Sequence, residues 1–300
     1  MTGGRIWRRV DGVLLLDKAS GVSSNSALQA ARRLFAAAKA GHTGTLDPLA
    51  SGLLPLCFGV ATRFAGDLLG ADKTYVADLL FGVRTDTGDA DGVVIARAPV
   101  AFSGRDLDAV LLRFQGPIRQ VPPMYSALKR NGRPLYDLAR QGLEVERAAR
   151  EVTIHDLCLL VFAGDRCRLR VTCSKGTYIR TLAEDIAAAL GCVAHLTALR
   201  RTAIAAFTVA DAVTLEQLAQ LDDEERVSCL READALVHSL PVLTLDQPAC
   251  RRFCQGNPVP ADVSPGRYRV YAATVLLGLG EVDGAGSLRP RRVVSQAAAQ

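Results

Sequence analysis

The chain has 300 residues, of which 49% are hydrophobic and 22% charged, and its formal net charge is +5. This length and composition are typical of a soluble globular protein with one large domain and one small one. The apolar run at residues 13–16 is too short for the core of a signal peptide, and no other run could span a bilayer, so we expect no leader and no membrane segment.

The positive charge is distributed unevenly. Residues 119–150 carry seven bases and three acids, residues 251–294 carry the same numbers, and residues 211–234 carry two bases and eight acids. Two basic segments separated by an acidic one suggest a polyanion bound at two places. Ordinary solvent-exposed arginines would give the same counts, so the charge alone leaves both interpretations open.

The eight cysteines do not form a disulfide or zinc pattern. None belongs to a Cys-x-x-Cys pair, and Cys250 and Cys254 have no histidines at zinc-finger spacing. Cys167 and Cys173 fall on the apolar phase of an alternating segment. We therefore expect free thiols, no metal site and a cytoplasmic protein.

The first predicted elements are a buried strand at residues 13–16 and an amphipathic helix. Ser23, Ser24 or Asn25 can cap this helix, and Gly41 is its expected end. Its apolar stripe consists of Leu28, Ala31, Leu34, Phe35 and Ala38.

Residues 41–52, Gly-His-Thr-Gly-Thr-Leu-Asp-Pro-Leu-Ala-Ser-Gly, hold a single carboxylate between glycines. Glycines allow tight turns and close approach to a ligand. Asp47 presented in this way could attack a carbon atom as a nucleophile. An Asp-Pro pair also favours a helix start, with Asp47 as the N-cap and Pro48 in the first turn.

Further along the chain, strands and helices interleave without βαβ regularity. We expect strands at 75–83, 93–96 and 166–174, and a helix capped by Ser103. A second helix, with Ile179, Leu182, Ile186 and Leu190 turned inward, should end at Gly191. This order favours a mixed sheet with helices packed on it.

Two segments depart from this core pattern. Residues 120–150 are rich in Pro, Arg and Gly and predict a projecting element. After Pro241 the chain breaks into short strand-like pieces with Gly and Pro turns, including 268–271 and 274–279.

Five motifs follow one another through most of residues 10–210. They are HTGTLDPLASGLLP at 42–55 with Thr62-Arg63, KTY at 73–75, RTDTGDADG at 84–92, QVPPMYSA at 120–127 and KGTYIR at 175–180. In order and spacing they resemble the motifs of the TruB-type tRNA pseudouridine synthases, and a fainter likeness continues to the C-terminus. Five motifs in one order are far more specific than any one of them.

The resemblance implies an α/β protein of the α+β type, with a mixed, largely antiparallel central sheet and packed helices: the pseudouridine synthase fold. Residues 1–243 would form the catalytic domain, and about 120–150 a flexible thumb over the RNA. Residues 244–300 would form a small, β-rich, PUA-like RNA-binding domain.

The resemblance also implies three catalytic residues. Asp47 matches the nucleophile, Arg180 the arginine that pairs with it, and Tyr75 the tyrosine that packs on the target base. An adjacent guanidinium would keep a buried carboxylate ionised. Without the motif, Arg180 fits an exposed helix position and Tyr75 fits a strand aromatic in the core.

Four more residues match positions that bind the substrate. His42 would stack where the flipped base leaves the RNA loop, Tyr178 and Leu199 would line the pocket, and Lys18 would act structurally or electrostatically near the first strand. In the thumb, Arg130, Arg133 and Arg140 would contact phosphates.

The implied activity is isomerisation of the T-loop uridine at position 55 of tRNA by an Asp-dependent, base-flipping mechanism. The base is detached, rotated and rejoined through carbon, which needs neither a nucleotide cofactor nor a metal. Consistent with this, the chain has no phosphate loop, no Gly-x-Gly-x-x-Gly and no His-x-x-x-His. The expected partner is the tRNA T-stem-loop, bound by a monomer.

Two other functions stay open on the sequence. One is a non-catalytic module that binds or folds tRNA on the same scaffold. The other is a metal-dependent nuclease that uses Asp86, Asp89 and Asp91, although a turn rich in Thr and Asp explains this cluster equally well.

Overall fold

The computed structural model describes residues 6–126, 128–130 and 132–294. Ala127, the last residue of one motif, and the outer ends of the two predicted domains lie outside the described residues.

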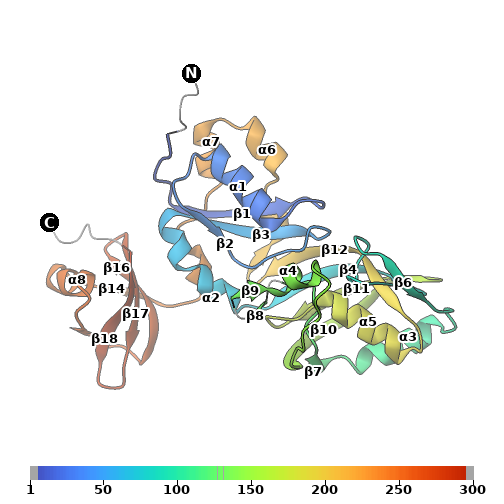
Figure 1. Ribbon diagram of the computed structural model, residues 1–300. Helices are drawn as coiled ribbons and strands as arrows, with labels where there is room; N and C mark the ends of the chain where they lie inside the picture. Colours follow the sequence, from blue (N-terminus) through green and yellow to red (C-terminus); the bar gives the residue numbers. More distant parts are fainter. Residues whose placement is uncertain (1–5, 127, 131, 295–300) are drawn as a thin grey trace.

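The larger part of the molecule is built on a nine-stranded sheet (Figure 1). Its strands follow the order β1-β3-β12-β4-β11-β10-β7, with β2 beside β3 and β13 beside β12. Among these described strands the pairing of β12 with β3 is parallel and the others are antiparallel. The predicted mixed, largely antiparallel sheet is thus confirmed. The bounds are β1 Gly12–Lys18, β2 Ala40–His42, β3 Ser51–Phe58, β4 Lys73–Phe81, β7 Gly116–Gln120, β10 Arg150–Ala163, β11 Arg166–Cys173, β12 Ala194–Ile204 and β13 Phe207–Thr208.

Helices α1 (Ser24–Leu34), α3 (Gly104–Leu112) and α5 (Ile179–Ala189) pack their apolar sides into one core cluster with the sheet. The predicted Ser103 cap is present as a capping box with Asp106. Short helices complete this part of the chain: α2 Ala65–Leu69, α6 Leu215–Gln220 and α7 Asp223–Ser228.

Helix α1 ends earlier than its apolar stripe predicts. Its last residue is Leu34, and Ala36 adopts a left-handed conformation with φ of 47°. The chain then turns into β2, so Ala38 and Gly41 are not helical. Phe35 is still buried because its ring packs on Phe58, with the ring centres 5.0 Å apart.

The opposite face of the sheet divides into an apolar half and a polar half. Over β1 and β3, residues such as Val13 and Leu53 pack against Phe64 and a segment around Leu236. Over β11 the exposed outward residues are Arg166, Arg168 and Arg170, and Arg168 pairs with Asp78 of β4 at 2.6 Å.

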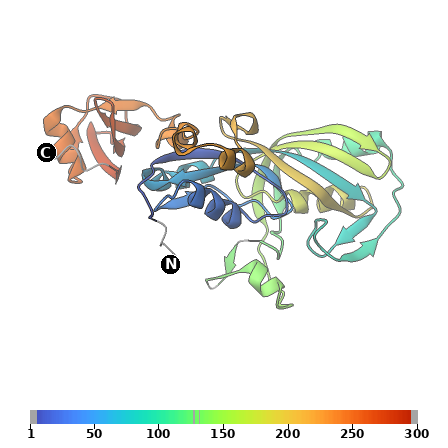
Figure 2. The same ribbon diagram turned by 90° about the horizontal axis from the view of Figure 1, so that it is seen from above.

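The thumb, residues 120–150, leaves the sheet between β7 and β10 and stands away from it (green in Figure 2). It contains a small hairpin, β8 (Lys129–Arg130) and β9 (Arg133–Pro134), and helix α4 (Leu135–Ala139). Its two ends, Gln120 and Arg150, are direct partners in the sheet register. A further hairpin, β5 (Val83–Thr85) with β6 (Val94–Arg97), lies beside β12.

A second sheet forms the C-terminal part and begins two residues before the predicted boundary. Its order is β14-β16-β17-β18-β15, and helix α8 (Gln247–Cys254) packs beside it. The bounds are β14 Val242–Thr244, β15 Val259–Pro260, β16 Gly266–Ala272, β17 Val275–Val282 and β18 Ser287–Val293.

The C-terminal sheet is attached to the larger part by packing and by ion pairs. Leu279 belongs to the same core cluster as Val13 and Leu53. Arg267 pairs with Asp67 of α2 at 2.6 Å, and Arg292 pairs with the same carboxylate. Five of the seven bases in residues 251–294 are held in ion pairs within the chain: Arg267, Arg269, Arg289, Arg291 and Arg292.

All eight cysteines fall within the described residues and are free thiols. Each described helix falls short of the length and apolarity needed to cross a bilayer.

Candidate active site

Asp47 lies on the loop that joins β2 to β3. A helix does not begin at Pro48, so the interpretation of Asp47 as an N-cap is wrong: its backbone oxygen accepts a turn bond from the Ala50 N–H at 3.1 Å, and β3 follows at Ser51. Gly52 has φ of 100°, and a Cβ there would stand 2.3 Å from the Arg201 oxygen. This glycine therefore allows the start of β3 to approach β12 closely.

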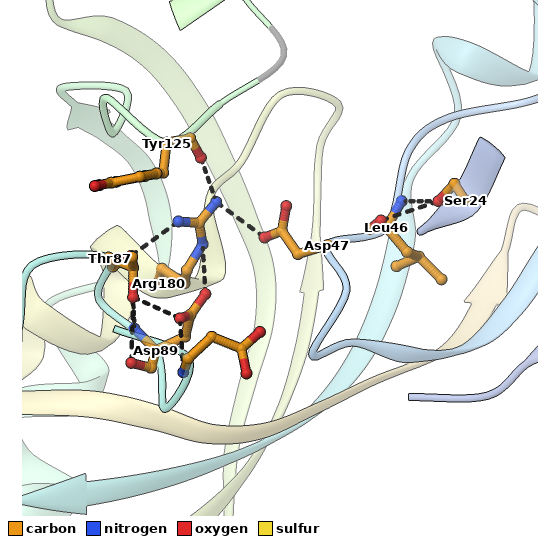
Figure 3. Close-up of polar contacts among 8 residues, drawn as sticks. Ser24, Leu46, Asp47, Thr87, Asp89, Tyr125 and Arg180 are labelled. Carbon is orange, nitrogen blue, oxygen red and sulfur yellow. Dashed lines mark hydrogen bonds and ion pairs between the residues drawn. The ribbon is translucent and has the colours of Figure 1, made fainter. Parts of the chain in front are cut away.

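Arg180 forms an ion pair with Asp47. Its Nη2 lies 2.9 Å from Oδ2 of Asp47 (Figure 3). The side chain of Arg180 is 5% exposed, whereas that of Asp47 is 39% exposed. Arg180 is thus not the exposed helix residue that its sequence position alone allows. The pair has a buried cation and a carboxylate open on one side.

The Arg180 guanidinium also binds two other segments, the Thr87–Asp89 turn and the thumb at Tyr125. Nη1 donates to the Thr87 oxygen at 2.8 Å, and Nη2 donates to the Tyr125 oxygen at 2.7 Å. Nε stands 3.7 Å from Oδ2 of Asp89, which is buried. Sequence reasoning did not single out Asp89 or the Tyr125 carbonyl for this site, although both lie in the recognised motifs.

The acidic cluster around Asp89 is organised as a turn. Oδ1 of Asp89 accepts from the Thr87 hydroxyl at 2.6 Å and from the Asp91 N–H at 3.2 Å. Asp86 accepts from the Val93 N–H at 2.8 Å. No group of three metal-ligating side chains occurs in the described part of the chain. The geometry therefore favours the turn over the nuclease interpretation.

Opposing effects act on the ionisation of Asp47. Burial raises the pKa of its carboxyl, and the nearby Asp89 raises it further, while the Arg180 guanidinium opposes both. The net effect is a raised pKa, so the loop holds a carboxylate that is more basic than an ordinary aspartate and that depends on Arg180 to ionise.

Tyr75 lies on β4 next to a second buried cation. Its register partner on β12 is Arg201, which is 1% exposed and donates from Nε to the Leu53 oxygen at 2.8 Å. Burial raises the pKa of the Tyr75 hydroxyl, and Arg201 opposes this. Arg201 is a site residue that the sequence reasoning missed, because an Arg-Arg pair in a strand carries no mark of burial.

Lys18 is placed behind the Asp47 loop. It is 1% exposed, and its Nζ donates to the Val22 oxygen at 2.7 Å and to the Ala19 oxygen at 2.9 Å. Burial lowers its pKa to about 8, although Asp47 opposes this. Lys18 therefore presents no surface to a substrate here and reaches Asp47 only through its charge.

The other predicted substrate residues lie at the end of β2, before α5 and on β12. His42 lies on β2, half-buried, and burial lowers its pKa. Tyr178 precedes α5 with the Arg150 guanidinium 4.9 Å above its ring. Leu199 and Leu49 line a cavity of about 440 Å³ whose lining does not include Asp47.

The three thumb arginines lie on the projecting element and not around Asp47. Arg130 donates to the Glu146 oxygen at 2.8 Å, Arg133 donates to the Gln141 side chain at 3.2 Å, and Arg140 stands 5.7 Å over the ring of Tyr136. All three side chains are exposed.

Three family models match the chain in sequence. Residues 32–179 match the N-terminal domain of the TruB family pseudouridylate synthases, 180–238 the tRNA pseudouridylate synthase B C-terminal domain, and 241–294 the C-terminal domain of pseudouridine synthase II TruB.

Full-length relatives are also similar. A protein named tRNA pseudouridine synthase B from Dechloromonas aromatica (strain RCB) is 57% identical over 98% of both chains. One of the same name from Burkholderia lata is 55% identical over 97% of this chain and 92% of that protein.

Solved structures have the same fold. The protein in "Crystal Structure of a Cbf5-Nop10-Gar1 Complex" has a TM-score of 0.68 and 25% identity, over 96% of this chain and 80% of its own. The protein in a structure of an H/ACA RNP bound to a substrate RNA containing 2'-deoxyuridine has a TM-score of 0.71 and 23% identity, over 95% and 85%.

Proposed function

Since this chain belongs to the TruB family of pseudouridylate synthases, we propose that it converts the T-loop uridine at position 55 of tRNA into pseudouridine, with Asp47 as the essential carboxylate. It is a pseudouridine synthase and therefore an isomerase. The tRNA substrate is carried over from the names of the relatives, and the position and the roles of the residues from the motifs.

The ion pair between Asp47 and Arg180 is the observation that supports this proposal most directly. Arg180 occupies one carboxylate oxygen at 2.9 Å, and 39% of the Asp47 side chain faces outward. A carboxylate that is held ionised by a buried guanidinium and left accessible is suited to attack or deprotonate a substrate carbon.

The isomerisation breaks the bond between N1 of the base and C1' of the sugar and forms a bond between C5 and C1'. The proton on C5 is lost, and N1 ends with a proton, so atoms and electrons balance without an external reagent. Asp47 starts the reaction by acting on the sugar or on the base ring. Tyr75 packs on the flipped base, and its hydroxyl with the raised pKa lies near the proton that C5 gives up.

Groups away from the Asp47–Arg180 pair recognise the tRNA. The thumb presents Arg130, Arg133 and Arg140 for phosphates. His42 stacks on a base displaced from the loop. Lys18 takes the electrostatic role, since its charge lies close to Asp47 behind the loop. We expect the enzyme to act as a monomer in the cytoplasm.

The test is incubation of the purified chain with a uridine-containing T-stem-loop transcript, followed by mapping of pseudouridine. We expect conversion at position 55, at the same rate in the presence of a chelator. No pseudouridine in the stem-loop or in the whole tRNA would contradict the proposal, and conversion at another position would contradict the T-loop assignment.

A further inference from the structure

Ser24 holds the backbone next to Asp47. This serine is the first residue of α1 and is 2% exposed. Its hydroxyl donates to the Leu46 oxygen at 2.9 Å and accepts from the Leu46 N–H at 2.8 Å (Figure 3). Both polar backbone groups of the residue before Asp47 are therefore satisfied by one side chain.

Gln120 does the same for the residue two positions before Arg180. It is 1% exposed and is the last residue of β7, where the thumb begins. Its Oε1 accepts from the Tyr178 N–H at 3.1 Å, and its Nε2 donates to the Tyr178 oxygen at 3.3 Å. Tyr178 is the N-cap of α5, so Gln120 fixes the start of the helix whose second residue is Arg180.

We propose that Ser24 and Gln120 are positioning residues for the reaction: each fixes the backbone beside one member of the Asp47–Arg180 pair, and together they set the separation of carboxylate and guanidinium. Neither touches the reacting atoms. This inference rests on the proposed isomerase activity.

The chemistry of the two side chains explains why a serine and a glutamine occupy positions 24 and 120. A buried backbone N–H and C=O on one residue need a donor and an acceptor together. A hydroxyl supplies both from one atom, and a carboxamide supplies them from two atoms. Both bonds are made across long sequence distances, 22 residues for Ser24 and 58 for Gln120, so they fix the loop and the helix to separate elements.

The consequence for catalysis follows from geometry. A shift of about 1 Å in a reacting group costs on the order of 100-fold in rate. A loosened pair also lets Arg180 oppose the raised pKa of Asp47 less effectively, so the pKa rises further. Loss of either positioning bond should therefore lower kcat and move the acid limb of the kcat/KM profile to higher pH.

The experiment compares Ser24→Ala and Gln120→Met with two matched controls. Ser26→Ala removes an exposed hydroxyl from the same turn of α1, which hydrogen-bonds the Ser23 hydroxyl at 2.8 Å. Gln115→Met removes a carboxamide that donates to the Leu157 oxygen at 3.3 Å, away from the site. For each protein we measure thermal unfolding, kcat and KM on the stem-loop, and the pH profile.

We expect kcat to fall about 10- to 100-fold in Ser24→Ala and in Gln120→Met, with KM changed less than about threefold and the acid limb moved upward. The controls should keep kcat within about twofold. If one test variant fails to fold, the other carries the test, because the two lie on different elements.

The proposal is overturned if the folded test variants lose no more kcat than their controls, or if the acid limb stays in place. These results differ from failure of the proposed function, in which the wild-type chain itself forms no pseudouridine.

Discussion

Two buried arginines each pair with an aspartate at 2.9 Å, one in each part of the molecule, and the two pairs are built differently. Arg180 pairs with Asp47, whose side chain is 39% exposed. Arg269 pairs with Asp234, whose side chain is 2% exposed and also accepts a bond from the Tyr271 hydroxyl. Distance alone does not distinguish the two pairs.

The difference lies in what surrounds the carboxylate. Asp234 is enclosed and bound by Arg269 and by the Tyr271 hydroxyl, so its pair joins the C-terminal sheet to the segment before it. Asp47 is bound on one side only, by Arg180. Its pKa is raised because burial disfavours the charged carboxylate. The structural ion pair encloses both partners, whereas the candidate catalytic pair encloses the cation and leaves the anion open on one side.

The strongest test of this comparison is Asp47→Asn. The amide keeps the size of the side chain but is a poor nucleophile, so we expect turnover to fall by about 10⁴-fold or more while RNA binding is kept. The melting temperature should change little, because Asp47 is open on one side and Arg180 keeps its bonds to the Thr87 and Tyr125 oxygens. Rates near wild type in a pseudouridine assay would remove Asp47 from catalysis.

Asp234→Asn should show the reverse pattern. Removing one partner of a buried pair costs about 3–5 kcal/mol in the free energy of unfolding, while the rate on an isolated stem-loop should change little. Denaturant titration and the stem-loop assay measure the two effects.

The control for Asp234→Asn is Glu281→Gln, which breaks an exposed pair with Arg291 in the same sheet. That change should cost no more than about 1 kcal/mol. Equal losses in the two variants would show that burial does not distinguish these pairs.

Arg180→Met removes the cation from the open pair. A charge-assisted bond is typically worth about 1.5–3 kcal/mol, so we expect turnover to fall by about one to two orders of magnitude. Wild-type rates and an unchanged pH profile would show that the guanidinium does not serve Asp47.

A third class of arginine lies on the thumb, where Arg130, Arg133 and Arg140 contact carbonyl, amide and ring groups rather than carboxylates. Replacing all three with glutamine should weaken tRNA binding about tenfold. It should also reduce the salt dependence of binding, since fewer counterions are released. Turnover at saturating RNA should fall less than affinity. An unchanged salt slope would place these residues away from the RNA.

The smallest expected effect is a shift of the pH profile. Asp47 must be ionised to act, and its pKa is raised above the ordinary value of 3.8, so kcat/KM should rise with pH through a limb above that value. The same shift destabilises the fold as pH rises through the raised pKa, and Asp47→Asn should lack that dependence. A limb at or below 3.8 would contradict the raised pKa.

The sequence predicted what depends on local periodicity. Alternation identified β11, the apolar stripes located α1 and α5, and the Ser103 cap located the start of α3. It failed where a distant contact overrides a local preference. The Asp47-Pro48 pair is typical of a helix start. In the structure the carboxylate pairs with Arg180, 133 positions along the chain, and the strand β3 follows instead of a helix.

Other features had no local signal at all. Ala36 ends α1 with a left-handed conformation that alanine rarely adopts. The burial of Arg180 depends on partners from three separate segments, the Asp47 loop, the Thr87–Asp89 turn and the thumb at Tyr125, which only the fold brings together. The recognised motifs marked Arg180, but its geometry could not be read from them.

Gln120 and Arg150, the two ends of the thumb, pair directly in the sheet register, so the thumb can change in length during evolution. Because the excursion between them starts and ends on adjacent strands, its length can change without altering the sheet, and each doubling costs only about 0.6 kcal/mol in closure entropy. The carbonyl of Tyr125 binds Arg180. Beyond that residue, insertions and deletions in the thumb should therefore cost little free energy of folding. A change in the length of the thumb could therefore alter which RNAs are bound while the Asp47–Arg180 pair stays the same.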